Sequence, residues 1–270
     1  MLKISIMTMV FGGALSDGTL TDVGMLHALE SAGFDGIEVF SGHFVGHPER
    51  VKTCGRYLAD SKLEVTCVDA GCNFVGRDAA ARTTACDALR AGIDLARTLR
   101  APVVLAAGSQ LFDGCSPADG RKMIIDGLQT CMPAARKAGV TLAIEDFGVA
   151  PTLQCVAADC AEVLDAVPGL AFVFDTGNFY FCGEDPLRNL DLLAHRTCHV
   201  HLKDWVKSDT PEIADVSGTA LGNGLIPNEE IVHRLLAKRY TGGLSIELGA
   251  PGDKMQAARK DLETVRAWLT

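Results

Sequence analysis

The feature that most constrains the fold is a regular alternation of short apolar segments with longer amphipathic segments along the whole chain. Eight short segments are typical of β-strands because they are rich in apolar and β-branched residues: 3–9, 36–40, 65–70, 102–107, 140–146, 171–175, 198–203 and 243–248. Eight helix-like segments follow them in turn: 21–32, 48–61, 78–99, 117–138, 156–166, 186–195, 227–239 and 253–269. This α/β alternation predicts parallel βαβ units, and eight such units predict a closed (β/α)8 TIM barrel that forms a single domain over 1–270.

Local signals support the boundaries of these segments. Ser116-Pro117 offers a helix cap followed by proline at the first helical position, and Gly33 and Gly139 each follow a helix-like segment. An open, doubly wound sheet is the alternative arrangement of such units. It would require a glycine-rich fingerprint after the first strand, which residues 12–14 (GGA) do not supply.

The composition argues against several classes of protein. With 34 acidic and 25 basic residues, the chain has a formal net charge of −9, which argues against a nucleic-acid partner. No run of about 18 apolar residues occurs, so the sequence predicts no association with a membrane. The N-terminal stretch MLKISIMTMVFGG lacks a cleavage site of small residues and is interpreted as a first strand. The ten cysteines include no C-x-x-C pair, so we interpret them as buried thiols of a cytoplasmic protein.

Four of the predicted strands end in a residue that can bind a metal ion: Glu145, Asp175, His201 and Glu247. In all four strands, the alternation of side chains places the bulky apolar residues on one face and the polar residue on the other. The carboxyl ends of barrel strands form the mouth, so these four side chains are expected to converge there. Burying three carboxylates and an imidazole together is costly unless a ligand compensates them. The set therefore predicts one divalent cation, and its oxygen-rich donors suit Mn²⁺, Mg²⁺ or Co²⁺.

Further candidates share the inward face near the same mouth. Glu38, on the second strand, is expected to bind substrate hydroxyls or to form an ion pair in the mouth. Asp69, at the end of the third strand, is a candidate for substrate binding. Lys203 lies two residues beyond His201 and is expected to hold a substrate oxygen, to assist proton transfer, or to pair with Asp69 or Glu38. His199 lies deeper on that strand and is interpreted as a hydrogen-bonded histidine behind the site.

The longest irregular stretch, 204–225, follows the seventh strand, and long loops at this end of a barrel usually carry function. Asp204 is expected to fix this loop. Gly222 and Gly224 either approach the substrate closely or form a simple turn, and the sequence does not decide between the two.

Five short motifs connect the chain to a known family. They are IEDFG at 144–148, FDTGN at 174–178, HVHLKD at 199–204, LGNG at 221–224 and SIELG at 245–249. In this order they resemble the xylose isomerase-like TIM-barrel superfamily, especially its sugar isomerase/epimerase branch. The resemblance implies that Glu145, Asp175, His201 and Glu247 hold one divalent metal. It also implies that Glu145 and Glu247 act as the catalytic acid/base pair.

The activity that this resemblance implies is metal-dependent isomerisation or epimerisation of a small keto-sugar or polyol. The metal polarises the carbonyl of a hydroxy-ketone, one glutamate removes the neighbouring proton, and the other returns a proton to the resulting enediolate. Loss of a β-hydroxyl from the same enediolate would instead give dehydration, so a lyase acting on a keto-sugar or keto-inositol is the alternative. A sugar-binding or regulatory protein is a further alternative, which the intact pair of glutamates argues against.

Departures from the family pattern narrow this interpretation. Asn178 stands where many epimerases of the family have a histidine aimed at a substrate oxygen, and it is kept as a substrate-binding candidate. The absence of arginine from 204–232 argues against a tagatose-type 3-epimerase specificity. The family's DNA-repair endonucleases use extra histidines to hold three zinc ions. Asn178, Asp69 and the acidic composition argue against that activity.

The expected partner is a small-molecule sugar without a phosphate group. Glu229 and Glu230 lie in the first turn of the predicted helix 227–239, where they would repel a phosphate. The loops 41–47 and 204–220 could pack between the subunits of a homo-oligomer.

Overall fold

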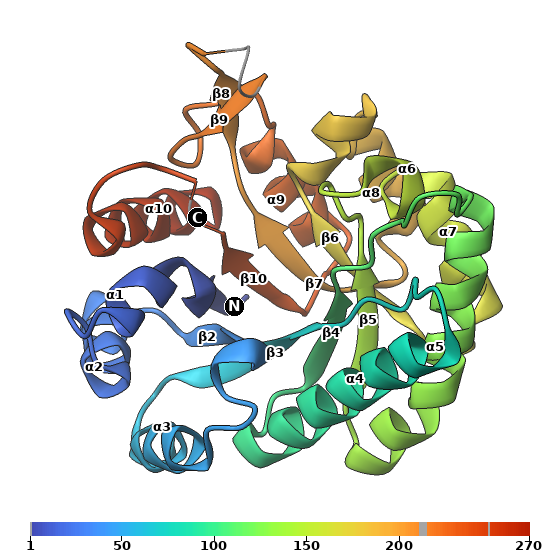
Figure 1. The fold of residues 1–270 in the computed structure, drawn as a ribbon. Coiled ribbons are helices and arrows are strands. Elements are labelled where there is room, and N and C mark those ends of the chain that lie inside the picture. The colour runs from blue at the N-terminus through green and yellow to red at the C-terminus, as the bar shows by residue number, and fades with distance from the viewer. Residues whose placement is uncertain (1, 211–214, 248) are drawn as a thin grey trace.

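Eight parallel strands close into a barrel in the computed structural model, which describes residues 2–210, 215–247 and 249–270. Around the barrel, each strand pairs with its neighbours in the order β1-β10-β7-β6-β5-β4-β3-β2. The bounds are β1 Ile4–Met7, β2 Gly36–Phe40, β3 Glu64–Gly71, β4 Val103–Ala107, β5 Thr141–Glu145, β6 Ala171–Asp175, β7 Thr197–Leu202 and β10 Gly243–Ile246. Figure 1 shows the strands surrounded by helices. The predicted (β/α)8 barrel is confirmed.

Eight main helices form the outer layer, one after each strand of the barrel. They are α2 Asp22–Ala32, α3 Pro48–Asp60, α4 Ala79–Leu99, α5 Pro117–Ala138, α7 Ala157–Ala166, α8 Pro186–Leu193, α9 Asn228–Ala237 and α10 Lys254–Trp268. The predicted cap is present, because the Ser116 side chain accepts a hydrogen bond from the backbone N–H of Asp119. Gly33 and Gly139 end their helices at positive φ, where glycine carries no steric penalty.

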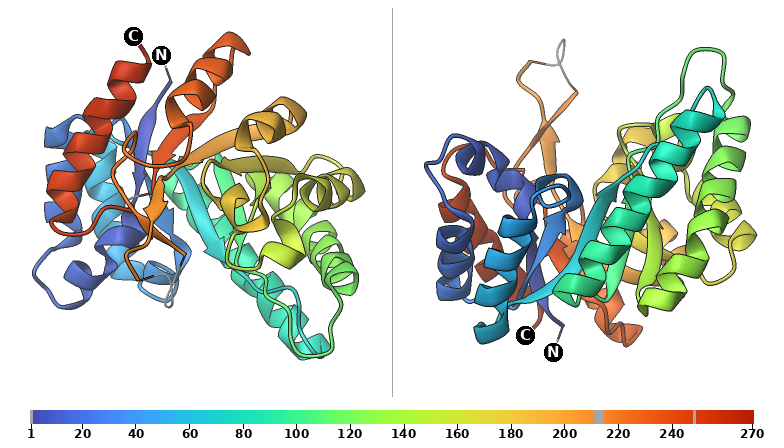
Figure 2. Two further views of the ribbon diagram at one scale, coloured as in Figure 1. Left: turned by 90° about the horizontal axis from the view of Figure 1, so that it is seen from above. Right: turned by 60° about the horizontal axis from the view of Figure 1, so that its bottom comes forward.

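Several short elements were not predicted from the sequence, because three to five residues show too little periodicity. They are η1 Thr8–Phe11, α1 Gly12–Ser16, η2 Ser41–His43, α6 Pro151–Gln154, η3 Asn178–Cys182, β8 Trp205–Lys207 and β9 Val216–Gly218. β8 and β9 form an antiparallel hairpin in the loop expected to be irregular. In the right view of Figure 2 this hairpin lies at the end of the barrel opposite the two chain ends. Residues 211–214 of the loop 204–220, and Leu248 of the last predicted strand, lie outside the described residues.

The predicted alternation of faces divides the apolar residues into two cores. Bulky residues such as Ile144 and Phe174 belong to the large core between strands and helices. A smaller cluster inside the barrel contains Cys67, Val103, Leu105, Ala143 and Val173. The polar residues that end these strands share the inward face, so the pattern of alternation is confirmed.

The ten cysteines are free thiols, and seven of them are buried. None of the helices in the described part of the chain combines the length and apolar character needed to cross a bilayer.

The register of the strands determines which residues lie side by side in the candidate site. A shift between Phe172 and Val173 on β6 brings Asp175 directly beside His201 on β7. His201 also faces Ser245 on β10. Residues that are far apart in the sequence therefore lie side by side near the mouth.

Candidate metal centre and active site

Three of the four predicted metal ligands converge. Glu145, Asp175 and His201 each offer a ligand atom, and these atoms lie within 4.8 Å of one another. Nδ1 of His201 is 3.5 Å from Oε2 of Glu145 and 3.9 Å from Oδ2 of Asp175. All three side chains are buried. Two carboxylates and an imidazole nitrogen therefore share a space that is mostly closed to water.

The sequence after β6 orients Asp175. Its Oδ1 accepts hydrogen bonds from the backbone N–H groups of Gly177 (2.8 Å) and Asn178 (2.9 Å), which begin η3. Its Oδ2 is left to face the site. A Cβ at position 177 would lie only 2.5 Å from Cγ of Lys203, so glycine is needed there for close packing. The FDTGN motif thus builds both the turn and the ligand.

Asp146 supports Asp175 from behind and was not among the predicted site residues. Its Oδ1 accepts a hydrogen bond of 2.9 Å from the backbone N–H of Asp175, and its side chain is fully buried. Burial raises the pKa of Asp146 well above its usual value, and the nearby Asp175 carboxylate adds to the rise. The available signal in the sequence was a second acid directly after Glu145.

Lys203 is the positive charge at the centre of the site. Its Nζ lies 2.8 Å from Oδ2 of Asp175 and 2.6 Å from Oε2 of Glu247. It also donates a hydrogen bond of 3.2 Å to Oδ1 of Asn178. Burial acts to lower the pKa of Lys203, but Asp175 and Glu247 outweigh it and raise that pKa. The expected pairing with Asp69 or Glu38 is replaced by pairing with two predicted metal ligands.

Glu247 is the predicted ligand that lies apart from the other three. It does not belong to the group formed by Glu145, Asp175 and His201. Its side chain is about one-quarter exposed and reaches the group through Lys203. Its backbone N–H donates to the carbonyl of Leu202, which extends the pairing of β10 with β7.

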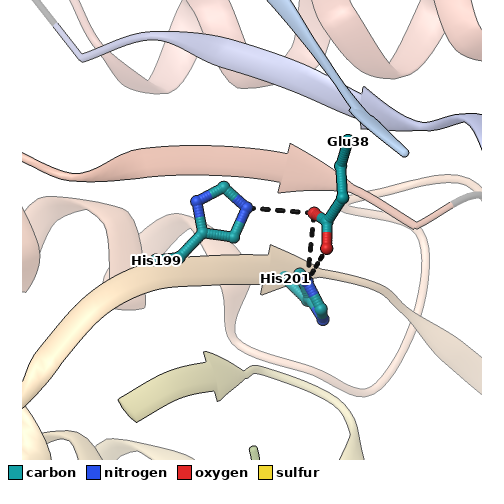
Figure 3. Close-up of side chains that lie close together, drawn as sticks. All are labelled: Glu38, His199 and His201. Atoms are coloured by element: carbon teal, nitrogen blue, oxygen red, sulfur yellow. Dashed lines mark hydrogen bonds and ion pairs between the residues drawn. The ribbon is translucent and has the colours of Figure 1, made fainter. Parts of the chain in front are cut away.

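Glu38 contacts two histidines, His199 and His201, through its carboxylate (Figure 3). Its Oε1 is 3.0 Å from Nε2 of His201, and its Oε2 is 3.0 Å from Nε2 of His199. Burial acts to raise the pKa of Glu38, but the two histidines outweigh it and hold that pKa well below its usual value. Glu38 is 1% exposed and is not among the residues that line the pocket at the mouth. Of its two expected roles, the structure shows the ion pair, formed with the two histidines, and the binding of substrate hydroxyls stays a prediction.

A pocket of about 330 Å³ opens above the site. Six of the predicted site residues line it: Asp69, Glu145, Asn178, His201, Lys203 and Glu247. The remaining lining is mainly apolar, with Met7, Met9, Phe40, Phe147 and Val149 as its larger side chains. The polar residues come mostly from β5 to β10, and the apolar ones mostly from the ends of β1, β2 and β5.

Asp69 is the polar exception on the far wall. Asp69 lies near the carboxyl end of β3, which is opposite β7 in the strand order of the barrel. Its Oδ1 is buried without a hydrogen-bond partner. Burial raises the pKa of Asp69 well above its usual value, and the carboxylates of Glu38 and Glu145 add to the rise. The site therefore faces a carboxyl group that has a free position for a ligand.

Asp204 fixes the loop after β7, as expected. This fully buried carboxylate accepts hydrogen bonds from the backbone N–H groups of Trp205, Gly222, Gly224 and Ile226, at 2.9 to 3.0 Å. A Cβ at position 224 would lie 2.2 Å from Oδ1 of Asp204. The two glycines therefore serve the packing of the loop around Asp204, and neither lines the pocket.

The residues present fit a divalent cation. Nδ1 of His201 is buried and has no hydrogen-bond partner, and Oδ2 of Asp175, 3.9 Å away, is buried beside the ammonium group of Lys203. An unpaired buried nitrogen is costly, and a metal ion is a ligand that it can share with the two carboxylates. Ligands about 2.1 Å from one octahedral ion lie about 3 Å apart. The separations of 3.5 and 3.9 Å between Nδ1 and the carboxylate oxygens need to close by only a small amount.

Comparison with known proteins gives matches across most of the chain. A family model described as xylose isomerase-like TIM barrel matches residues 26–268. The chain is 29% identical over 173 residues to a putative hydroxypyruvate isomerase from Streptomyces coelicolor, which covers 61% of this chain and 58% of that protein. It is 31% identical over 116 residues to an inosose dehydratase from Mesomycoplasma hyopneumoniae, covering 37% and 39%. In both cases the chain spans less than two thirds of the relative's length.

Two solved structures share the fold over nearly the whole chain. A D-tagatose 3-epimerase-like protein superposes with a TM-score of 0.82 at 18% identity, covering 99% of this chain and 97% of the other. The IolI protein with a bound zinc atom gives a TM-score of 0.81 at 16% identity, covering 99% and 98%. At such identities, the likeness establishes the common architecture.

Proposed function

Because the chain belongs to the xylose isomerase-like TIM-barrel family, as its motifs predicted, we propose that it is a divalent-metal-dependent enzyme that isomerises or epimerises a small keto-sugar or polyol. The observation that carries this proposal is the group of Glu145, Asp175 and His201, with its unpartnered Nδ1, at the base of a pocket. The names of the isomerase and dehydratase relatives, and the zinc in IolI, support the same class of chemistry.

Glu145, Asp175 and His201 would hold the cation, and Glu247, which pairs with Lys203 in this structure, would complete the set as a fourth ligand. A bound divalent cation supplies Lewis acidity, which makes the C–H bond next to a carbonyl group more acidic. Mn²⁺, Mg²⁺ and Co²⁺ are the candidates that suit these donors, and Zn²⁺ is a further one because a neighbour in fold binds it.

Glu145 and Glu247 would move the protons. Both line the pocket, on strands that are separated by β6 and β7, so they approach a substrate from different directions. One carboxylate removes the proton next to the carbonyl carbon, and the other returns a proton to the opposite face or to the adjacent carbon. Lys203 holds Oε2 of Glu247 at 2.6 Å and thereby positions this carboxylate at the edge of the pocket.

The lining of the pocket supports an unphosphorylated substrate. Among its described residues, Lys203 is the only lysine or arginine, and two carboxylates already compensate its charge. A phosphate dianion would find no free cation there. The apolar side chains of Met7, Phe40 and Phe147 instead suit the C–H-rich part of a sugar, while its adjacent oxygens face the polar wall.

Dehydration is the second candidate, and Asp69 is the observation that favours it. Elimination needs an acid that protonates the departing hydroxyl group. Asp69 lies on the wall opposite the proposed ligands, has a free Oδ1, and has a raised pKa because it is buried. After Glu145 or Glu247 removes the proton from a keto-sugar or keto-inositol, Asp69 would donate its proton to the β-hydroxyl group, which would leave as water.

The test is incubation of the metal-loaded protein with a panel of unphosphorylated keto-sugars and keto-inositols in D₂O. Deuterium at a carbon next to the carbonyl group, without a new ultraviolet absorbance, supports isomerisation or epimerisation. A growing enone absorbance supports dehydration. Absence of both, together with sugar binding that Glu247→Gln leaves unchanged, would show a binding protein and overturn the proposal.

A further inference from the structure

We propose that Glu38 is a positioning residue that fixes the proton of His201 on Nε2, so that the cation is bound through Nδ1. This inference rests on the proposed metal site, but it concerns a residue outside the ligand set. Its evidence is the contact geometry of Glu38, His199 and His201 in the closed interior of the barrel (Figure 3).

The two nitrogens of the His201 ring have different surroundings. Nε2 lies 3.0 and 3.1 Å from the two carboxylate oxygens of Glu38. Nδ1 has no hydrogen-bond partner and faces Glu145 and Asp175. An ionised carboxylate only accepts hydrogen bonds, so Nε2 must carry a proton to make these contacts. In the neutral ring, Nδ1 then has the free lone pair that a metal requires.

The interior of the barrel leaves enough space for the Glu38 side chain to reach His201. Glu38 starts on β2, and β1 and β10 lie between that strand and β7. The inward residues that these two strands present on the way are small, namely Ser5 and Ser245, and both are fully buried. A long glutamate side chain can therefore cross the interior of the barrel.

His199 holds the carboxylate of Glu38 in place. Its Nε2 is 3.0 Å from Oε2 of Glu38, and both side chains are 1% exposed. A carboxylate without partners would be unstable at this depth, and two imidazole donors compensate it. Gly243 makes room for the His199 ring, because a Cβ at that position would lie 3.0 Å from the ring atoms. His199 therefore stabilises the carboxylate that contacts His201, and it reaches the proposed metal site only through Glu38.

The direct test is nitrogen NMR of ¹⁵N-histidine-labelled protein loaded with Zn²⁺, which is diamagnetic. We expect His201 to be metal-bound at Nδ1 and protonated at Nε2. Metal bound at Nε2 of His201 would overturn this inference while leaving the proposed function intact. A wild-type protein that binds no divalent cation would overturn both.

Variants supply an independent test through metal affinity, measured by competition with a chromophoric chelator for Co²⁺. In Glu38→Gln the amide NH2 group lies beside Nε2 of His201 in either orientation, because Nε2 contacts both carboxylate oxygens, and an N–H group cannot accept the proton of Nε2. We expect a 10- to 100-fold weaker affinity, the usual effect of removing a partner behind a metal-binding histidine. Asp69→Asn is the matched control, because it changes another buried carboxyl group near the site to an amide, and this carboxyl group makes no hydrogen bond with either histidine.

Asp69→Asn should change the Co²⁺ affinity several-fold less than Glu38→Gln does. Equal weakening in the two variants would mean that Glu38 acts no differently from another buried carboxyl group near the site, and it would overturn the positioning role. The visible spectrum of bound Co²⁺ adds a second readout. It should shift in Glu38→Gln because the His201 ring is reoriented, and it should stay unchanged in Asp69→Asn.

Discussion

Nζ of Lys203 lies 2.6 Å from Oε2 of Glu247, so the fourth predicted metal ligand is held by a cation of the protein itself. The same ammonium group lies 2.8 Å from Asp175. Lys203 therefore compensates part of the negative charge that the candidate metal centre gathers. A bound divalent cation would therefore interact with the same carboxylates as Lys203 does.

Replacing Lys203 by Met should destabilise the metal-free protein and increase its dependence on metal. Breaking a buried ion pair by removing one partner costs about 3–5 kcal/mol of unfolding free energy. A saturating divalent cation should recover more stability in Lys203→Met than it adds to the wild type. Urea unfolding with and without metal measures both quantities.

Lys238→Met is the control for Lys203→Met. Lys238 pairs with Asp191 at 2.9 Å on the surface, where such a pair is worth about 1 kcal/mol or less. A metal-induced gain in Lys203→Met that is no larger than in the wild type would contradict the view that lysine and metal share the carboxylates.

The stability of the metal-free protein should depend on the ionisation of Asp175. Burial raises the pKa of Asp175 from 3.8 to about 6, against the opposing charge of Lys203. The folded protein therefore binds an extra proton in this interval, so this contribution to stability is present at low pH and is lost as pH rises from 3.8 through about 6. Asp175→Asn cannot ionise and should lack this slope in urea unfolding across the interval. Identical slopes in the two proteins would contradict the assignment.

The two proposed acid/base residues should differ in their effect on metal binding. Glu145 belongs to the group with Asp175 and His201, whereas Glu247 reaches that group through Lys203. We expect Glu145→Gln to lose both turnover and most of its metal affinity. Glu247→Gln should lose turnover by about 10²-fold or more, the typical contribution of a general acid or base, and keep metal affinity closer to the wild type. Calorimetry and the D₂O exchange rate measure the two effects, and a weaker metal affinity in Glu247→Gln than in Glu145→Gln would reverse this ranking.

Asp204 should be important for stability although it lies outside the pocket. Its carboxylate accepts four backbone hydrogen bonds, and an amide at this position would turn an N–H group toward N–H donors. Asp204→Asn should lower the free energy of unfolding by about 2–4 kcal/mol. Asp209→Asn, at an exposed position of the same loop, should change it by less than about 0.5 kcal/mol. A similar cost in both variants would show that the four bonds contribute little.

The barrel and most of the site could be predicted because strand periodicity is a local property. In β5, β6 and β7 the alternation of bulky and polar residues identified the face of Glu145, Asp175 and His201 without any knowledge of distant contacts. The end of a barrel strand then placed all three at the same mouth. Short elements such as β8 and β9 escaped prediction, because their hairpin depends on pairing across a loop.

The partners of Glu38, Asp146 and Lys203 could not be predicted because they depend on side-chain reach. Glu38 crosses the barrel interior past small residues on two intervening strands, and no sequence spacing encodes that path. Asp146 acts through the backbone of Asp175, on another strand. Lys203 could pair with any of several carboxylates in the mouth, and only the three-dimensional arrangement selects Asp175 and Glu247.

Diffraction from crystals of the wild-type protein soaked with Mn²⁺ tests the central claim most directly. Anomalous scattering locates the ion without reference to any expected ligand. We predict one strong peak within bonding distance, about 2.1–2.3 Å, of side-chain atoms of Glu145, Asp175 and His201. A peak outside the reach of these three residues, or no peak at a saturating Mn²⁺ concentration, would contradict the account.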